Sequence, residues 1–100
     1  MHYSNNHVHS FFFPTTINDE HLHYIRAYTM PASGGLDNHV HRYYGTTTYN
    51  NGHTHNYNGV TGPALPLPGR GHYHMLQGGT TFDHGHRHFY EGRTGGNIRV

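Results

Sequence analysis

Histidine is the residue type in this sequence with the greatest capacity for chemistry, because a neutral imidazole is a good ligand for transition metals. The chain of 100 residues contains 14 histidines, and twelve of them form pairs separated by one residue. In a β-strand, residues i and i+2 point to the same face about 7 Å apart, so both rings of such a pair can lean onto one cation. The six pairs are His7/His9, His21/His23, His39/His41, His53/His55, His72/His74 and His86/His88.

The number of pairs limits the coordination geometry. Two facing pairs supply four nitrogens, which suit tetrahedral zinc or tetragonal copper and nickel. Three pairs around an axis supply six nitrogens, which suit octahedral iron, cobalt or nickel. The twelve paired histidines therefore predict either three four-histidine sites or two six-histidine sites for a divalent transition metal such as Zn, Cu, Ni or Fe. The alternative is a metal-free ladder of imidazoles hydrogen-bonded to threonine and tyrosine, and the unpaired His2 and His84 are expected to be incidental.

Catalytic interpretations are disfavoured. A metal saturated by imidazole leaves no position for water, so we expect a structural metal. The segment His86–Glu91 is similar to the metal motif of cupins, but its glutamate comes one residue early and the same histidine pair recurs five times elsewhere. No serine lies in a nucleophile-elbow context, and no glycine-rich loop precedes a helix. We expect no enzyme activity, no catalytic residue and no organic cofactor.

The pairs belong to a longer repeat. Their starts are separated by 14, 18, 14, 19 and 14 residues, which defines a unit of 32 to 33 residues with two pairs. Three copies span residues 7–38, 39–71 and a shortened 72–100, after an N-terminal extension of residues 1–6. Each copy has two consecutive threonines eight residues after its start. A single histidine-rich domain of three tandem repeats is therefore predicted.

The local chemistry favours strands. Thr, Tyr, Phe and Val occur in short runs closed by Gly, Asn-Gly or Pro, and no 3.6-residue apolar period is present. Asn50–Gly52 and Asp83–Gly85 are typical of hairpin turns, and Pro63–Gly71 is predicted to be a linker or an extended edge. Each histidine pair is expected to open a strand just after a turn. The predicted fold is all-β, with tandem repeats of short β-hairpins that each have two His-x-His strands, in a solenoid- or meander-like order.

The second and third copies share the consensus His-x-His-x-x-x-Gly-x-Thr-x-x-x-x-Gly-His-x-His-x-x-x-Gly-x-Thr-Gly, over His39–Gly62 and His72–Gly95. This pattern resembles the YmaF family of small histidine-rich bacterial proteins, and the resemblance extends over roughly residues 7–98. The first copy departs from it, because four of its glycine positions hold other residues. The resemblance implies no specific activity. The departures are Phe13, Glu20, Ala27 and Met30.

Composition limits the partners. Leu, Ile, Val and Phe together number 17, which is few for a stable core, so a bound metal would help the chain to fold. The formal net charge of +1 gives no electrostatic footprint for nucleic acid. No apolar run is long enough to cross a membrane, and Met1–Ser10 is too polar for a signal peptide. We expect neither nucleic-acid binding nor membrane insertion, and the absence of cysteine and lysine is compatible with a location outside the cell.

Three functional hypotheses follow. In the first, the chain is a structural protein that self-assembles into a fibre or array, because hairpin edges accept another strand and the aromatic content exceeds what a small core can bury. In the second, it is a soluble metal-binding or buffering protein. In the third, it is a trimeric phage or appendage tip in which three chains share six-histidine sites. Self-association and metal ions are the predicted partnerships.

Overall fold

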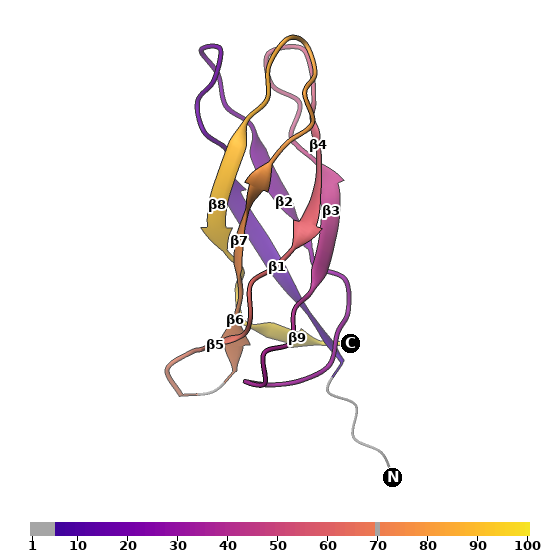
Figure 1. Ribbon diagram of the computed structural model, residues 1–100, viewed down its shortest axis with the longest axis vertical. Helices are drawn as coiled ribbons and strands as arrows, with labels where there is room; N and C mark the ends of the chain where they lie inside the picture. The colour runs from indigo at the N-terminus through magenta and orange to yellow at the C-terminus, as the bar shows by residue number, and fades with distance from the viewer. Residues whose placement is uncertain (1–5, 70) are drawn as a thin grey trace.

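The computed structural model describes residues 6–69 and 71–100. Their fold is all-β, as predicted, and the molecule is elongated, with extents of 52 × 25 × 17 Å (Figure 1). Residues 1–5 of the predicted extension, with His2, lie outside the described residues. No helix suited to spanning a bilayer occurs in the described parts of the chain. The strands are β1 (His7–Pro14), β2 (Tyr24–Tyr28), β3 (Arg42–Thr46), β4 (Asn56–Val60), β5 (Leu65–Pro66), β6 (His72–Tyr73), β7 (Met75–Gly79), β8 (Phe89–Arg93) and β9 (Asn97–Arg99).

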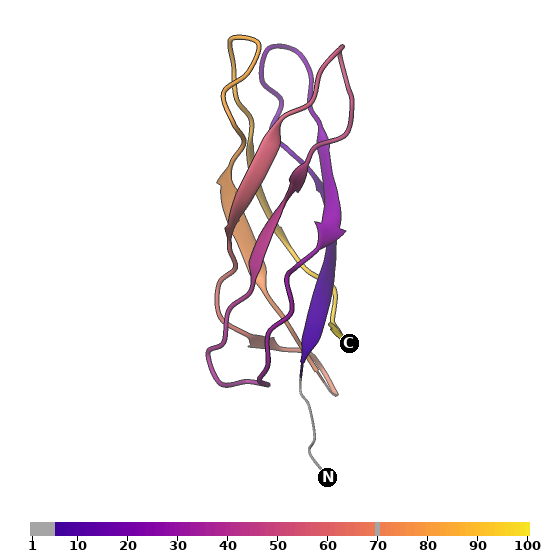
Figure 2. The same cartoon turned by 90° about the vertical axis from the view of Figure 1, so that its right-hand side faces the viewer.

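Three antiparallel hairpins form most of the molecule, one from each copy of the repeat. β1 pairs with β2, β3 with β4, and β7 with β8. The hairpins surround a common long axis, so that β2 lies beside β3, β4 beside β7, and β8 beside β1 (Figures 1 and 2). Isolated backbone hydrogen bonds join neighbouring hairpins, such as those from the Met30 N–H to the Arg42 carbonyl (2.7 Å) and from the Thr48 N–H to the Tyr24 carbonyl (3.0 Å).

All three hairpins turn at the end of the molecule away from the chain termini (Figure 1). In the second hairpin Asn50 bridges to His53, and the two residues between them have positive φ, 55° at Asn51 and 83° at Gly52. Two such residues define a type I′ turn. The turns expected at 50–52 and 83–85 are therefore present, and the first copy forms the same turn with Asp19 and Glu20.

Most strands begin one residue after a histidine pair, whereas the sequence pattern predicts that the pair opens the strand. Only β1 and β6 begin on the first histidine of a pair. The reason is a threonine hydroxyl in the ladder. Before β3, the His41 N–H donates to Thr61 Oγ1 (3.0 Å), while the Thr61 N–H donates to the His41 carbonyl (2.8 Å). Because a side-chain oxygen replaces a main-chain carbonyl, regular pairing ends at this position.

The core lies between the two ends and consists of residues two positions after the second histidine of each pair. Tyrosines cover glycines of the paired strand: a Cβ atom at Gly59 would lie 2.5 Å from the Tyr43 hydroxyl oxygen. Glycine is required there because any larger residue would displace the ring. The hydroxyls of Tyr43 and Tyr90 are hydrogen-bonded at 2.8 Å. The core residues are Phe11, Ile25, Tyr43, Tyr57, Leu76 and Tyr90.

The core also explains departures in the first copy. Phe13 occupies the position of Gly45 in the second copy, and its cross-strand partner is Ile25 in place of a tyrosine. In the third copy Gly92 pairs with Leu76, and the Phe13 ring of the neighbouring hairpin covers Gly92. An aromatic ring therefore still covers this glycine, but it comes from a different copy.

Candidate metal centres

The twelve paired histidines gather into two clusters at opposite ends of the core. Each cluster takes one pair from each copy, and within a cluster one potential ligand atom of each residue lies within 4.8 Å of all the others. We call the cluster near the chain termini the base cluster and the one near the three turns the tip cluster. The base cluster is His7, His9, His39, His41, His72 and His74, and the tip cluster is His21, His23, His53, His55, His86 and His88.

This arrangement decides between the two groupings that the sequence allows. The chain forms two six-histidine clusters in place of three four-histidine clusters. The alternating spacing explains why, since each copy runs from the base to the tip along one strand, turns, and returns along the other (Figure 2). A single chain supplies all six histidines of each cluster, so the sharing of sites among three chains that the trimer hypothesis invoked is not needed.

Within each cluster the Nε2 atoms converge. In the base cluster, His7 Nε2 lies 3.2 Å from His39 Nε2, 3.1 Å from His41 Nε2 and 2.9 Å from His72 Nε2. In the tip cluster, His53 Nε2 lies 3.2 Å from the Nε2 atoms of His21 and His23. The rings meet edge to face, with centroids 4.8 Å apart for His7 and His41.

The opposite nitrogen of each inner ring, the second histidine of a pair, is hydrogen-bonded to a backbone carbonyl. A carbonyl oxygen only accepts, so Nδ1 is the protonated nitrogen and, in a neutral ring, Nε2 has a bare lone pair. Such outer hydrogen bonds fix the tautomer and the orientation of metal-binding imidazoles. The bonds are His9 to Gly95 (3.0 Å), His23 to Thr48 (2.8 Å), His41 to Met30 (2.9 Å), His55 to Thr81 (3.0 Å), His74 to Gly62 (2.8 Å) and His88 to Thr16 (2.9 Å).

Burial favours the neutral form that metals require in five of the inner rings. It lowers the pKa of His9 to about 3 and the pKa values of His23 and His41 to about 4, and it also lowers the pKa values of His74 and His88. Burial lowers the pKa of the outer ring of His72 to about 4. The distances between Nε2 atoms are those of hydrogen bonds, but two bare lone pairs repel each other. Nε2 of His74 is buried and has no hydrogen-bond partner. A cation at the centre is the group that suits this convergence of lone pairs.

The outer rings, the first histidines of each pair, are also oriented. In the tip cluster the Nδ1–H groups of His21, His53 and His86 donate to the carbonyl of the residue two positions earlier, at 3.0, 3.1 and 3.1 Å. In the base cluster His39 Nδ1 donates to an Asp37 carboxylate oxygen at 3.0 Å. These bonds leave the Nε2 atom of each of these rings directed at its cluster.

Other polar groups lie beside the clusters but outside the ligand sets. Asp83 Oδ2 is 3.5 Å from His55 Nδ1, and Asp19 Oδ2 is 3.7 Å from His86 Nδ1. His84 stacks on His53 with ring centroids 4.6 Å apart, whereas the sequence predicts no contact for this unpaired histidine. Both candidate ligand sets therefore consist of imidazole alone.

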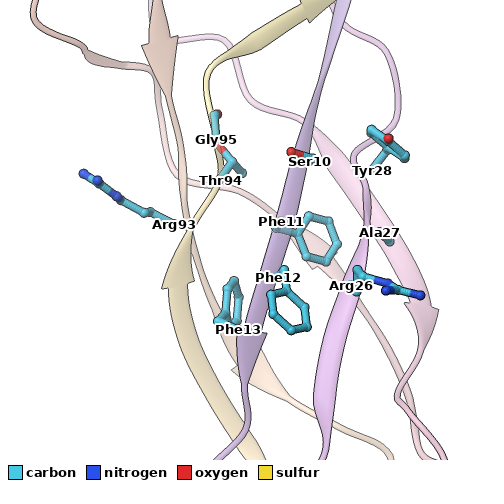
Figure 3. A pocket seen from close by; sticks show the side chains of 10 residues that line it. All are labelled: Ser10, Phe11, Phe12, Phe13, Arg26, Ala27, Tyr28, Arg93, Thr94 and Gly95. Atoms are coloured by element: carbon cyan, nitrogen blue, oxygen red, sulfur yellow. The ribbon is translucent and has the colours of Figure 1, made fainter.

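A separate groove lies where β1 and β2 meet the end of β8 (Figure 3). Phe11, Phe12 and Phe13 line it, and the side chains of Arg26 and Arg93 point away from each other at its sides. Among the described residues, its lining includes no histidine or carboxylate. The groove is therefore no part of the metal-ligand sets.

Comparison with protein families supports the resemblance noted from the motifs. Residues 6–95 match the model of the YmaF family, described as spore germination protein GerY/YamF. The chain belongs to the YmaF family. All twelve clustered histidines of this YmaF family member lie within the matched range. No curated protein and no solved structure matches the chain.

Proposed function

We propose that this chain binds two divalent transition-metal ions, one in each six-histidine cluster, and that the ions are structural. The observation that carries the proposal is the convergence of bare Nε2 atoms whose rings are fixed by Nδ1–H hydrogen bonds to carbonyls. A metal-free ladder would need protons between these nitrogens. The carbonyl acceptors and the lowered pKa values argue against such protons.

Energetics support a structural role. The apolar core is a single cluster of six buried residues, and neighbouring hairpins are joined by isolated hydrogen bonds. Each ion would tie all three hairpins together at one end of the molecule. Structural zinc sites contribute on the order of 10 kcal/mol to the folding of small domains, so two such ions would dominate the stability of this fold.

The family description suggests where this stability is used. Its members are described as spore germination proteins. We propose that this chain is a metal-stabilised structural component in that setting, with no enzymatic activity and outside the cytoplasm.

We further propose that the chain self-associates into a fibre or array. Ile17, Tyr49 and Phe82 occupy the same position just before the three turns and are 70, 74 and 62 % exposed. Three large apolar side chains around one end are suited to contact another copy. Replacing all three by serine is expected to abolish association in sedimentation-velocity experiments without loss of metal. A chain that sediments as a monomer at all concentrations would contradict this part of the proposal.

Elemental analysis of natively purified protein tests the metal proposal, and two ions per chain are expected. The variant H53A/H55A removes one pair from the tip cluster and is expected to lose one ion and much of its thermal stability. The matched control is His84→Asn, which removes a neighbouring histidine and places asparagine at the turn position that Asn51 occupies in the second copy.

The outcomes separate the hypotheses. No stoichiometric metal in the unaltered chain would overturn the proposal and favour a metal-free ladder. Loss of an ion without loss of stability would favour the alternative of a soluble metal-buffering protein, because exchangeable ions need not support the fold.

A further inference from the structure

The imidazoles of each cluster have the connectivity of an octahedron. Every ring adjoins all the other rings of its cluster except one. In an octahedron each vertex likewise adjoins all others except the opposite one, which is not true of a trigonal prism. The opposite pairs are His7 and His74, His9 and His39, and His41 and His72 in the base cluster, and His21 and His55, His23 and His86, and His53 and His88 in the tip cluster.

The size of the clusters also suits six-coordination. Four adjacent pairs of Nε2 atoms in the base cluster are separated by 2.9 to 3.2 Å, and five adjacent pairs in the tip cluster by 3.2 to 3.3 Å. An octahedron with edges of this length has vertices about 2.2 Å from its centre, slightly longer than the zinc–imidazole bonds of four-coordinate sites. Opposite vertices would be about 4.5 Å apart, within the observed limit of 4.8 Å.

We infer that each cluster is an octahedral, all-imidazole centre that selects Ni²⁺, Co²⁺ or Fe²⁺ over Zn²⁺ and Cu²⁺. The inference rests on the proposed function, because it assumes that a metal is bound. Zinc in closed protein sites prefers four ligands at tetrahedral positions, and Cu²⁺ prefers a tetragonal set. Magnesium and calcium prefer oxygen ligands. Nickel, cobalt and ferrous iron accept imidazole and six-coordination.

The rings have little freedom to adopt another geometry. Every inner ring is tied through Nδ1 to a backbone carbonyl, and its own backbone N–H is bonded to a buried threonine hydroxyl. Collapse to four ligands would leave two buried imidazoles unpaired, and a buried unpaired polar group is costly. The same saturation leaves no position for water or peroxide on the ion, so Fe²⁺ in these centres would be shielded from inner-sphere oxidation.

The test compares metals on the full chain. Protein refolded with Ni²⁺ is challenged with a tenfold excess of Zn²⁺, and the metal content and the X-ray absorption spectrum are measured after gel filtration. We expect two Ni²⁺ ions per chain to be retained, each with six nitrogen neighbours. The internal control is H53A/H55A, which leaves four imidazoles in the tip cluster: one Ni²⁺ ion per chain is expected to remain, in the base cluster, with six nitrogen neighbours.

Displacement of nickel by zinc at both clusters of the unaltered chain, or a coordination number of four, would overturn this inference and leave the proposed function intact. Failure of the chain to bind any of these metals would overturn both. If H53A/H55A does not fold, the coordination number in the unaltered chain still decides.

Discussion

The base and tip clusters each consist of six imidazoles, but different backbone elements hold them in place. In the tip cluster every outer histidine follows a two-residue turn, and in all three copies its Nδ1–H donates to the carbonyl of the first turn residue. In the described residues, no such turn repeats beside the base cluster. There β9 pairs with β1 across His7–His9, β5 pairs with β6, and the Asn97 side chain accepts the His72 N–H at 3.2 Å.

The difference is one of sequence separation. Each histidine pair of the tip cluster is positioned by the turn of its own hairpin. The scaffold of the base cluster, by contrast, pairs strands from the two ends of the chain, β1 and β9. Closing long loops costs more conformational entropy than closing short ones. The tip scaffold should therefore persist without its metal better than the base scaffold, although both clusters offer the same ligands.

Acidification is expected to have the largest effect. Burial lowers the pKa of His9 to about 3 and of His41 and His72 to about 4 in the base cluster, and of His23 to about 4 in the tip cluster. Unfolded histidines bind protons near pH 6.5. Stability is therefore fully present above pH 6.5 and falls below it, by about 1.4 kcal/mol per pH unit for each such ring until its folded pKa is reached.

Over two pH units the sum for several rings exceeds the usual stability of a domain, so we expect unfolding between pH 6.5 and 4. The tip cluster, with fewer strongly lowered pKa values, should lose its ion at the higher pH. A pH titration followed by metal release and circular dichroism measures both events. Retention of both ions at pH 4 would contradict the prediction, and release of both at one pH would remove the distinction between the clusters.

Paired substitution in the third copy gives the next largest effect. H72A/H74A removes two base ligands and H86A/H88A removes two tip ligands. Each is expected to lower the free energy of unfolding by on the order of 5 kcal/mol in the presence of metal. The base variant should lose more, because His72 lies in the two-residue strand β6, which pairs with the equally short β5, while the tip pair remains in a hairpin closed by its own turn. Thermal denaturation of both variants tests this order, and an equal or larger loss at the tip would contradict it.

The sequence predicts the parts of this molecule that depend on local spacing. The histidine pairs, the strand-rich fold and the turn at Asn50–Gly52 follow from neighbouring residues. The grouping into six-histidine clusters depends on three hairpins meeting around one axis, which spacing alone left open. The strand boundaries depend on hydroxyls such as that of Thr61, which accepts the His41 N–H across the hairpin. The cover of Gly92 by Phe13 depends on contact between copies, so it could not be read from either copy alone.

Threonine hydroxyls provide a test in which the two clusters should behave alike. Thr29 Oγ1 accepts the His9 N–H in the base cluster, and Thr15 Oγ1 accepts the His23 N–H in the tip cluster, both at 3.0 Å. Substitution of either by valine keeps the shape but leaves a buried N–H without a partner, which costs about 1 to 3 kcal/mol. Urea denaturation should give similar losses for T29V and T15V. The exposed T46V is the control and should change stability by less than about 0.5 kcal/mol.

Substitution of single glycines is expected to give the smallest loss of stability, and it tests which contact distinguishes the base cluster from the tip cluster. Gly52 in a tip turn has φ of 83°, and no atom lies within 4 Å of where its Cβ would be. Gly52→Ala should therefore cost only backbone strain, about 1 kcal/mol. Gly71 beside the base cluster has φ of 90°, but its Cβ would lie 2.6 Å from Asn97 Oδ1, the atom that accepts the His72 N–H. Gly71→Ala should cost the same strain plus that hydrogen bond, about 2 kcal/mol in total. Equal losses of unfolding free energy in urea denaturation would show that the hydrogen bond from the His72 N–H to Asn97 does not stabilise the base cluster. The added methyl group would then have displaced the Asn97 side chain without a further loss of stability.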